Sequence, residues 1–434
     1  MSINWQATRS QGLQGEFSVP GDKSISHRAI MLAALAEGVS TIEGFLEGED
    51  TRATARIFAQ LGVRIDTPNA QTRIVHGVGM HGLQASSEPL DCGNAGTGMR
   101  LLTGLLSGQA FDSQLIGDAS LSKRPMARVI KLLEMMGAHI SARDDNYAPL
   151  HIKGAQSLHG VEIDTLVASA QVKSALIFAA LYAQGETVIT EPRPTRDYTE
   201  SMLQALGWPL EYSAGRVVVR SGGMLKAGQI CIPGDISSAA FLIAAALLIP
   251  NSDITLRNIG VNPRRTGIIE AFKLMGGRID LLNQRLQSGE KVADIRVQSS
   301  VLVGIELPEH LVPDMIDECP IFFVTAALAS GTTHATGLAE LRVKESDRIA
   351  SMVKGLLAMG ANIIESSDSV IIQGGALRAA TIESFEDHRI AMSFAVAAQC
   401  ADGVTVIQDC ANVATSFPGF VELAQSIGMK LTLS

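Results

Sequence analysis

One pattern repeats along the whole 434-residue chain and constrains its fold more than any other feature. Six times, a helix-like segment ends in a glycine and a strand-like segment follows, as in IFAQLGVRI and LLAMGANI. The six glycines are Gly62, Gly137, Gly207, Gly276, Gly360 and Gly428, at intervals of 68 to 84 residues. A glycine just past a helix favours a left-handed C-terminal cap. We therefore expect six similar units of helices and strands.

A second kind of helical segment alternates with the first. It is rich in small and aliphatic residues on all sides, as in SSAAFLIAAALL and QVKSALIFAALYAQG. Helices that are apolar nearly all round are buried. Each unit is therefore predicted to hold one exposed helix, one buried helix and several strands.

The six units divide into two halves. PGDKS at Pro20 returns as PGDIS at Pro233, and Gly62 returns as Gly276 at nearly the same offset. The length also favours two domains over a single core. We predict an α/β protein of two similar domains with three units each: residues 21–233 form the first, residues 1–20 with 234–434 form the second, and the chain crosses over near 20 and 233. An ordinary α/β protein with chance internal similarity is the alternative.

Composition excludes several classes of protein. A net charge of −9 argues against a general nucleic-acid binder. No apolar run reaches membrane-spanning length, and the N-terminus lacks an apolar signal core, so neither a membrane protein nor secretion is expected. The five cysteines and nine histidines show no metal-binding or disulfide spacing, and the Rossmann and Walker fingerprints are missing. We expect a cytoplasmic protein without metal or nucleotide cofactor.

Polar residues gather where the buried helices begin. Residues that commonly cap helices stand there, namely Ser24 or Ser26, Asn94, Ser169, Asp235, Asp317 and Asp387. Cations lie in or beside the first turns and in VKESDR, namely Lys23, Arg28, Arg100, Lys173, Lys344, Arg348 and Arg389. A helix N-terminus is already partly positive, so added cations there indicate an anion-binding cleft. Pairing with nearby carboxylates is the alternative.

Short segments add groups suited to catalysis. DCGNAGTGMR brings three glycines into a helix start, where backbone N–H groups can approach an anion. Lys344 and Glu345 stand side by side as a candidate acid/base pair. Asp317, among apolar neighbours, suits a general base, a helix cap or both. His388 suits a structural role more than a catalytic one. The residues alone predict a cofactor-free enzyme with an anion-binding cleft, and they do not name its reaction.

Read in order, seven motifs resemble the successive signatures of the 5-enolpyruvylshikimate-3-phosphate synthase family: GDKSISHRAIM, GNAGTGMR, GDASLSKRPM, SAQVKSALIFAAL, RDYTESML, VKESDRI and EDHRIAM. They span residues 21 to 392. The resemblance implies two domains of three βαβαββ units each, with the buried helices inside. It also implies transfer of the enolpyruvyl (1-carboxyvinyl) group of phosphoenolpyruvate to the 5-hydroxyl of shikimate 3-phosphate, a step towards chorismate and the aromatic amino acids. We expect a cytoplasmic monomer that needs no cofactor and is a target of glyphosate.

The resemblance implies roles for individual residues. Shikimate 3-phosphate would be bound by Lys23, Ser24, Arg28, Ser169, Ala170, Gln171, Arg196, Asp317 and Lys344. Phosphoenolpyruvate would be bound by Lys23, Gly96, Arg124, Gln171, Arg348 and Arg389. Asp317 would accept the proton of the 5-hydroxyl. Glu345, with Lys23, would protonate the methylene carbon and later help remove that proton.

Three positions modify this expectation. Ala170 stands where some members carry a second serine, and Thr415 stands where some carry a lysine. These departures put one phosphate contact and one phosphoenolpyruvate contact in doubt. Gly96 is retained, whereas an alanine there accompanies glyphosate tolerance in the family, so the chain is predicted to be sensitive.

Three other functions compete with this prediction. The sister enzyme that uses UDP-N-acetylglucosamine typically carries KNA near its start and a reactive cysteine before an RP dipeptide, whereas this chain has DKSISHR and GDASLSKRPM. An RNA 3′-phosphate cyclase has related repeats but needs a nucleotide, and the acidic charge weighs against it. A repeat scaffold that binds a protein partner would not need cations and carboxylates clustered at helix starts.

Overall fold

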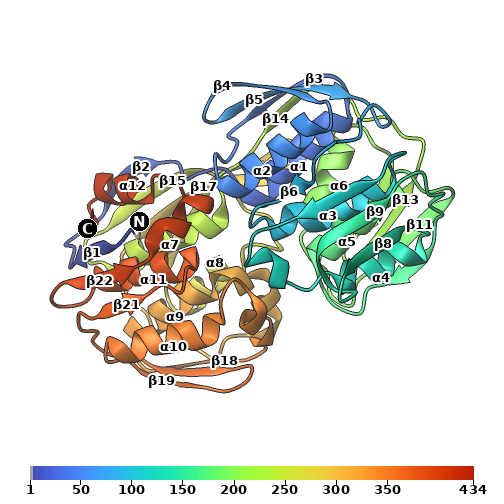
Figure 1. The fold of residues 1–434 in the computed structure, drawn as a ribbon. Coiled ribbons are helices and arrows are strands. Elements are labelled where there is room, and N and C mark those ends of the chain that lie inside the picture. Colours follow the sequence, from blue (N-terminus) through green and yellow to red (C-terminus); the bar gives the residue numbers. More distant parts are fainter. Residues whose placement is uncertain (1–2) are drawn as a thin grey trace. The chain divides into compact units, whose positions relative to one another are not determined.

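The computed structural model describes residues 3–434, which divide into two compact units (Figure 1). The inserted unit comprises Gly21–Ile232 and Leu286–Glu290, and the terminal unit comprises the chain up to Pro20, Pro233–Arg285 and Lys291–Ser434. Both chain ends belong to the terminal unit, where β1 (Trp5–Thr8) pairs antiparallel with β23 (Lys430–Leu433). The repeat pattern does not predict that the short segment Leu286–Glu290 groups with the inserted unit.

The six predicted glycine caps are confirmed. All six glycines have φ between 85° and 110°, the left-handed region that favours glycine. One helix ends just before each of them: α2 (Glu49–Gln60), α4 (Ala127–Met135), α6 (Tyr198–Ala205), α8 (Gly267–Leu274), α10 (Arg348–Ala358) and α12 (Phe420–Ser426). One strand follows each: β4 (Arg64–Asn69), β8 (His139–Arg143), β12 (Leu210–Ser213), β16 (Arg278–Gln287), β19 (Asn362–Glu365) and β23.

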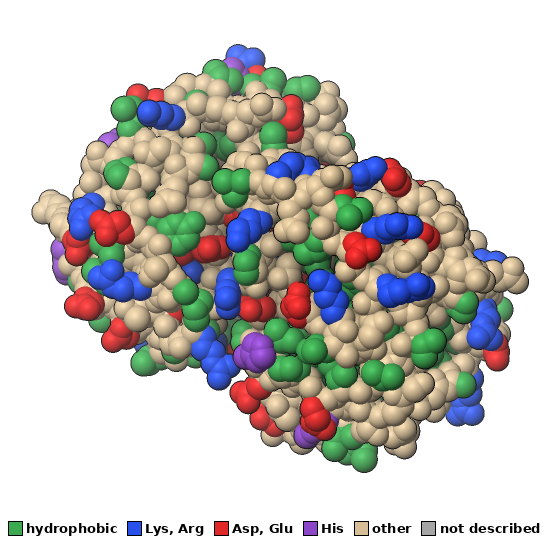
Figure 2. All heavy atoms as spheres, turned by 180° about the vertical axis from the view of Figure 1, so that it is seen from behind, with side chains coloured by type: hydrophobic (Ala, Val, Ile, Leu, Met, Phe, Trp, Pro, Cys, Tyr) green, Lys and Arg blue, Asp and Glu red, His purple; other side chains and the backbone are tan. Residues whose placement is uncertain are grey.

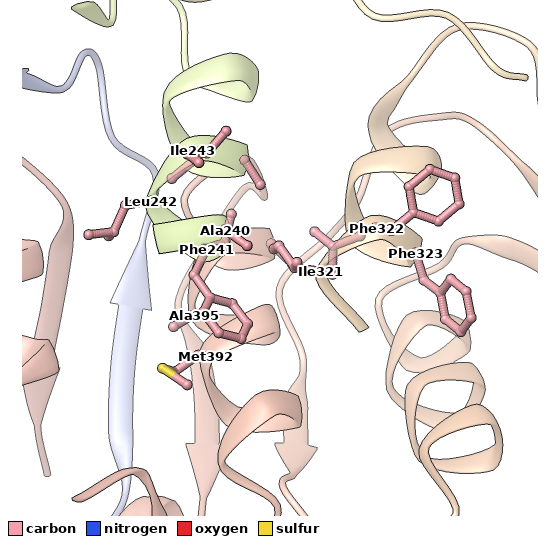
Figure 3. Packing of buried hydrophobic residues seen from close by; sticks show 14 of the residues in the cluster. Ala240, Phe241, Leu242, Ile243, Ile321, Phe322, Phe323, Met392 and Ala395 are labelled. Atoms are coloured by element: carbon pink, nitrogen blue, oxygen red, sulfur yellow. The ribbon is translucent and has the colours of Figure 1, made fainter. Parts of the chain in front are cut away.

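The six predicted buried helices are also confirmed. They are α1 (Lys23–Leu35), α3 (Gly96–Ser107), α5 (Ala170–Ala180), α7 (Ile236–Leu248), α9 (Cys319–Leu328) and α11 (His388–Ala398). In the terminal unit α7, α9 and α11 pack pairwise, and Figure 3 shows Phe241 of α7 beside Met392 and Ala395 of α11. In the inserted unit α3 packs against both α1 and α5. Small residues allow this close approach: a Cβ on Gly104 would lie 2.0 Å from the carbonyl oxygen of Ala175.

Each repeat also contributes a sheet in which the first two strands run parallel and the next two pairings are antiparallel. The inserted unit has the orders β14 (Gln229–Cys231)–β3 (Glu37–Glu43)–β5 (Thr72–Val78)–β4, β6 (Leu90–Asp91)–β7 (Ser113–Ile116)–β9 (Tyr147–Lys153)–β8, and β10 (Glu162–Asp164)–β11 (Glu186–Thr190)–β13 (Arg216–Arg220)–β12. This order, with two helices per repeat, gives the expected βαβαββ unit.

The terminal unit repeats this topology. Its sheets have the orders β2 (Gln14–Phe17)–β15 (Asp253–Gly260)–β17 (Glu290–Gln298)–β16, β18 (Thr332–Ala335)–β20 (Val370–Gln373)–β19, and β21 (Thr381–Glu383)–β22 (Thr405–Gln408)–β1–β23. In the three-stranded sheet, isolated parallel bridges at Val303 and Glu306 occupy the place of the fourth strand. The first and last strands of the chain thus complete one sheet.

The two units have separate hydrophobic cores, built mainly from aliphatic side chains and alanine. Within residues 3–434, no helix is long and apolar enough to cross a membrane. On the face drawn in Figure 2, basic and acidic side chains lie interspersed rather than in single-sign patches.

Candidate active site

Side-chain caps begin four of the six buried helices. Ser169, Asp235 and Asp387 accept hydrogen bonds from the backbone N–H groups of Val172, Ser237 and Arg389, as the sequence predicts. At α1 the prediction of Ser24 or Ser26 is wrong. The cap is Asp22, whose carboxylate accepts from the Ile25 N–H at 2.8 Å, so both serines lie inside the first turns.

The predicted caps of the other two buried helices are also wrong. The N-cap of α3 is Ala95, because the Asn94 side chain instead donates to Asp118 and accepts from Arg124, both at 2.6 Å. Helix α9 begins at Cys319, and Asp317 lies in the preceding 3-10 turn η3 (Ile316–Glu318). Asp317 therefore does not cap α9.

In the inserted unit, Arg28 connects three helices. Its Nε donates to the Thr199 hydroxyl at 2.8 Å and its Nη2 donates to the Ser174 hydroxyl at 2.7 Å, while Nη1 donates to the Ser24 carbonyl oxygen at 2.9 Å. Burial lowers the pKa of Arg28 to about 10, and the charge of Arg196 contributes to that shift. An anion bound beside Arg28 would favour its charged form.

A second group in the inserted unit joins α3 to α5. Gln171 accepts from Arg100 Nη1 at 2.7 Å and donates to Thr97 at 2.9 Å. Arg124, after the 3-10 turn η1 (Leu121–Lys123), donates to Asn94. Gly96 opens α3 beside this group, and a Cβ added there would lie 3.1 Å from Nη1 of both Arg100 and Arg124. Gly96 therefore leaves room for the guanidinium groups beside a helix N-terminus.

Lys23 lies in the first turn of α1 and pairs with the buried carboxylate of Asp50. His27, one turn on, is fully buried and its Nδ1 lies 2.7 Å from the Thr54 hydroxyl. Burial lowers the pKa of His27 to about 3, against the opposing effect of Asp50. The ring is therefore neutral near neutral pH, and Lys23 and Arg28 carry the positive charge of GDKSISHR.

Lys173 and Glu200, the sequence neighbours of Ser174 and Thr199, belong to a buried triad in which the sequence analysis named only the lysine. Lys173 Nζ lies 2.8 Å from a carboxylate oxygen of Glu191 and 2.8 Å from one of Glu200. Burial opposes the charge of Lys173, but the two carboxylates outweigh it and raise the lysine pKa. Burial also raises the pKa of Glu200, in spite of Lys173. Here the carboxylate-pairing alternative holds, because the charge of Lys173 is matched inside the protein.

In the terminal unit, Asp317 lies among cations from a separate segment. Its Oδ1 is 3.4 Å from Lys344 Nζ and 3.6 Å from Arg348 Nη1. Arg348 Nη2 also donates to Glu345 at 2.6 Å. The predicted base, the predicted proton donor and two predicted cations therefore form one cluster, although Asp317 and Lys344 are distant in the sequence.

The Arg348 guanidinium is fully buried and is fixed by Asp387, whose Oδ2 accepts from Nε at 2.8 Å. Burial opposes the arginine charge, but Asp387, Glu345 and Asp317 outweigh it and raise the Arg348 pKa. Burial likewise opposes ionisation of Asp387, yet Arg348 holds its pKa below the usual value. Both groups are charged, and Asp387 caps α11 while it orients Arg348.

Arg389 extends the cluster from α11. Its Nη1 donates to the Asp317 carbonyl oxygen at 2.9 Å and lies 3.5 Å from the buried carboxylate of Glu318. Arg265 also approaches the Asp317 side chain, with its Nη1 3.6 Å from Oδ2 of that carboxylate. Sequence reasoning missed Arg265 and Glu318. The only sequence signal for Glu318 was its place beside Asp317 in PDMIDECP. Arg265 lies in NPRRTG, which carries no recognisable motif.

The residues predicted from the sequence thus fall into two sets, one in each unit. Lys23, Ser24, Arg28, Gly96, Arg124, Ser169, Ala170, Gln171 and Arg196 belong to the inserted unit, whereas Asp317, Lys344, Glu345, Arg348 and Arg389 belong to the terminal unit. Within residues 3–434, no group of three or more His, Cys, Asp or Glu side chains is arranged to hold a metal ion. Each set contains cations held by carboxylates, amides or hydroxyl groups, which suits anionic ligands.

Comparisons with known proteins agree on one family. Residues 7–423 match the profile of EPSP synthase (3-phosphoshikimate 1-carboxyvinyltransferase). A 3-phosphoshikimate 1-carboxyvinyltransferase of Xanthomonas euvesicatoria pv. vesicatoria (strain 85-10) is 58% identical over 428 residues, which cover 99% of this chain and 97% of that protein. A solved EPSP synthase of Acinetobacter baumannii superposes with a TM-score of 0.92 at 46% identity and covers 100% of both chains.

Proposed function

The chain belongs to the EPSP synthase family, and on that premise we propose how its residues transfer the enolpyruvyl group of phosphoenolpyruvate to the 5-hydroxyl of shikimate 3-phosphate. One observation carries the proposal. Asp317 lies within 3.4 Å of Lys344 Nζ and 3.6 Å of Arg348 Nη1, and Arg348 in turn holds Glu345. A base, an acid and cations for charge stabilisation are thus grouped together.

Shikimate 3-phosphate binds through its phosphate and its ring hydroxyls. In this proposal its contacts are Lys23, Ser24, Arg28, Ser169, Ala170, Gln171, Arg196, Asp317 and Lys344. The buried hydrogen bonds of Arg28 support this assignment, because they fix the guanidinium before the ligand arrives. With alanine at 170, Ser169 provides the one hydroxyl that the segment 169–171 offers to the phosphate.

Phosphoenolpyruvate carries a carboxylate and a phosphate. Its proposed contacts are Lys23, Gly96, Arg124, Gln171, Arg348 and Arg389. Three of these are arginines, whose planar forks suit bidentate contacts with such groups. Arg348 is held by Asp387 and Glu345, so its orientation costs little at the moment of reaction.

The chemistry begins at Asp317. Its carboxylate accepts the proton of the 5-hydroxyl while that oxygen attacks C2 of phosphoenolpyruvate. Glu345, with Lys23, donates a proton to the methylene carbon, which gives a tetrahedral intermediate. The C2–O bond to phosphate then breaks, and inorganic phosphate leaves with the proton that Asp317 accepted. Glu345 and Lys23 help remove a proton from the methyl group, which restores the double bond.

The reaction is tested by release of inorganic phosphate from phosphoenolpyruvate without added metal. We expect release only when shikimate 3-phosphate is also present. UDP-N-acetylglucosamine serves as the alternative acceptor and should give no release. Release with that acceptor instead would overturn the assignment of the substrate, and silence with both acceptors would overturn the reaction itself.

Substitution of Gly96 by alanine is expected to weaken phosphoenolpyruvate binding. The added methyl would lie 3.1 Å from Arg124 Nη1, so the flexible end of that side chain must shift. A loss of about 1 kcal/mol, typical of a weakened hydrogen bond, raises KM for phosphoenolpyruvate about fivefold. Steady-state kinetics measures this change, with glyphosate inhibition followed in parallel. The wild-type enzyme should be inhibited, and Gly96→Ala should need more glyphosate.

Gly228→Ala is the matched control, since an added Cβ there meets nothing within 4 Å. It should leave KM for phosphoenolpyruvate and the glyphosate response unchanged. A Gly96→Ala variant with wild-type KM, or a wild-type enzyme insensitive to millimolar glyphosate at low phosphoenolpyruvate, would contradict the proposed place of Gly96.

The expectation of a cytoplasmic monomer stays a proposal. The five cysteines form no disulfide within residues 3–434, and burial raises the pKa of the Cys400 thiol to about 11, which makes it inert. These features suit a reducing compartment. Light scattering of the purified enzyme would give its mass directly.

A further inference from the structure

Arg265 is a buried cation in the terminal unit to which the proposed mechanism assigns no role. It lies between β15 and α8, and 4% of it is exposed. Its Nη2 is 3.5 Å from Asp235 and 3.5 Å from Glu318, and it donates to the Ser237 hydroxyl. Its Nη1 is 3.6 Å from Asp317 Oδ2. One guanidinium thus faces three carboxylates, one of which is the proposed base.

The orientation of Arg265 is fixed by groups behind it. The Ser237 hydroxyl accepts from Arg265 and donates to Glu318 Oε1, so the position of its proton is defined. Ser237 itself is anchored, because its N–H donates to the Asp235 cap at 2.8 Å. Glu318 is fully buried. The hydrogen bonds of Ser237 to Arg265 and to Glu318 therefore hold the Nη2 end of the guanidinium against a buried carboxylate.

The two ends of the Asp317 carboxylate are approached by different cations. Lys344 and Arg348 lie on the Oδ1 side, and Arg348 is also committed to Asp387 and Glu345. Arg265 lies on the Oδ2 side. It therefore opposes rotation of the carboxylate and adds a positive charge on its Oδ2 side.

We propose that Arg265, held by Ser237 and Glu318, is a positioning residue that aims the Asp317 carboxylate at the acceptor hydroxyl and keeps it ionised. This inference rests on the proposed role of Asp317 as the base. Arg265 acts through Asp317 and touches neither substrate.

Several charged groups act on Asp317 and set how its activity depends on pH. They are Arg265 before α8, Asp235 before α7, Glu318 in η3, Lys344 and Glu345 before α10, Arg348 in α10, and Asp387 and Arg389 at the start of α11. Removal of one nearby cation raises the pKa of a carboxyl group by about one unit or more. The acid limb of the kcat profile should move to higher pH accordingly.

The decisive variant is Arg265→Gln. We expect kcat at pH 7 to fall at least about tenfold, a part of what complete loss of a general base costs. The acid limb of the kcat profile should move to higher pH by about one pH unit. The Kd for shikimate 3-phosphate, measured by calorimetry, should stay within about threefold. Arg265→Lys keeps the charge and should restore the pH profile, with only part of kcat because the fork is lost.

Arg264→Gln is the matched control. It removes the same charge one residue away, from a side chain that is 39% exposed and lies 3.3 Å from Asp314. Its kcat and pH profile should be those of the wild type. If Arg265→Gln fails to fold, Ser237→Ala decides, because it keeps α7 and removes the hydroxyl that holds Arg265. It should lower kcat and shift the acid limb in the same direction, by less.

The outcomes distinguish the role of Asp317 as the base from the role of Arg265 as its positioning residue. If Asp317→Asn retains most of its turnover, the base is misassigned and the proposed mechanism fails. If Asp317→Asn is inactive while Arg265→Gln, or Ser237→Ala in its place, keeps the wild-type kcat and pH profile, the role of Arg265 is overturned. An equal effect in Arg264→Gln would likewise overturn it, because the effect would then come from net charge.

Discussion

Substitution of Asp317 by alanine is expected to lower kcat at least about a hundredfold, the lower range for loss of a general base. The carboxylate lies within 3.6 Å of three cations, Lys344, Arg348 and Arg265, which favour its ionised, proton-accepting form. Without it, the 5-hydroxyl must attack before it can lose its proton. Phosphate release at saturating concentrations of both substrates measures the loss.

Asp317→Asn refines the test, because it keeps the shape of the side chain and removes only its charge and basicity. We expect a similar loss of kcat, with much smaller effects on the Kd for shikimate 3-phosphate. Asp314→Asn is the matched control, since Asp314 lies three residues away and pairs with Arg264 at 3.3 Å. Retention of most of the turnover by Asp317→Ala or Asp317→Asn would remove Asp317 from the mechanism.

Much of the fold follows from local rules that a sequence displays directly. The six glycines mark helix ends because a left-handed cap depends on a single residue, usually glycine. All six glycines adopt the left-handed conformation. The alanine-rich helices are buried because a segment without a polar face must be covered on every side. With six copies, these signals reinforce one another, and the family comparison and the solved relatives agree with them.

Local rules failed where side chains had competing partners. Asn94 was expected to cap α3, but Asp118 and Arg124 engage its amide. Asp317 was expected to act as a general base, a cap of α9 or both, but the 3-10 turn η3 places it ahead of the helix. A cap is a local preference of about 1 kcal/mol, and stronger charge-assisted contacts override it.

The feature that the sequence predicted least well was which cations form ion pairs with carboxylates inside the protein. Lys173, Arg28 and Arg389 look alike in sequence, each near the start of a buried helix. Lys173 meets two buried carboxylates, whereas Arg28 meets hydroxyl groups and a carbonyl oxygen. Glu191 follows directly after β11 and Glu200 lies in α6, and no spacing in the sequence reveals their pairing with Lys173. Cations at helix starts therefore serve structure as well as ligands.

The consequence of that pairing is a second large expected effect. Lys173→Met should lower the free energy of unfolding of the inserted unit by about 3–5 kcal/mol, the cost of leaving a buried charge without its partner. Glu191 and Glu200 would then lie close together in a dry environment with no lysine between them. Guanidinium denaturation measures the change through the fluorescence of Trp208, which is buried in the inserted unit.

The fluorescence signal must report the unfolding of the inserted unit alone. The second tryptophan, Trp5, belongs to the terminal unit, so all variants carry Trp5→Phe as a common background. Lys131→Met is the control, because Lys131 lies exposed on α4 of the same unit. It should leave the midpoint almost unchanged. An additional Glu200→Gln substitution should recover part of the loss, because it neutralises one of the two carboxylates.

The same variant should also weaken binding of shikimate 3-phosphate, for a structural reason. Ser174 and Thr199 adjoin Lys173 and Glu200 in sequence, bond to each other at 2.8 Å and both receive hydrogen bonds from Arg28. The ion triad thus keeps α5 and α6 in the register that orients Arg28 for the ligand phosphate. If Lys173→Met lowered stability but left KM for shikimate 3-phosphate unchanged, the triad would hold the fold without orienting Arg28. A wild-type midpoint would show that Glu191 and Glu200 do not depend on Lys173.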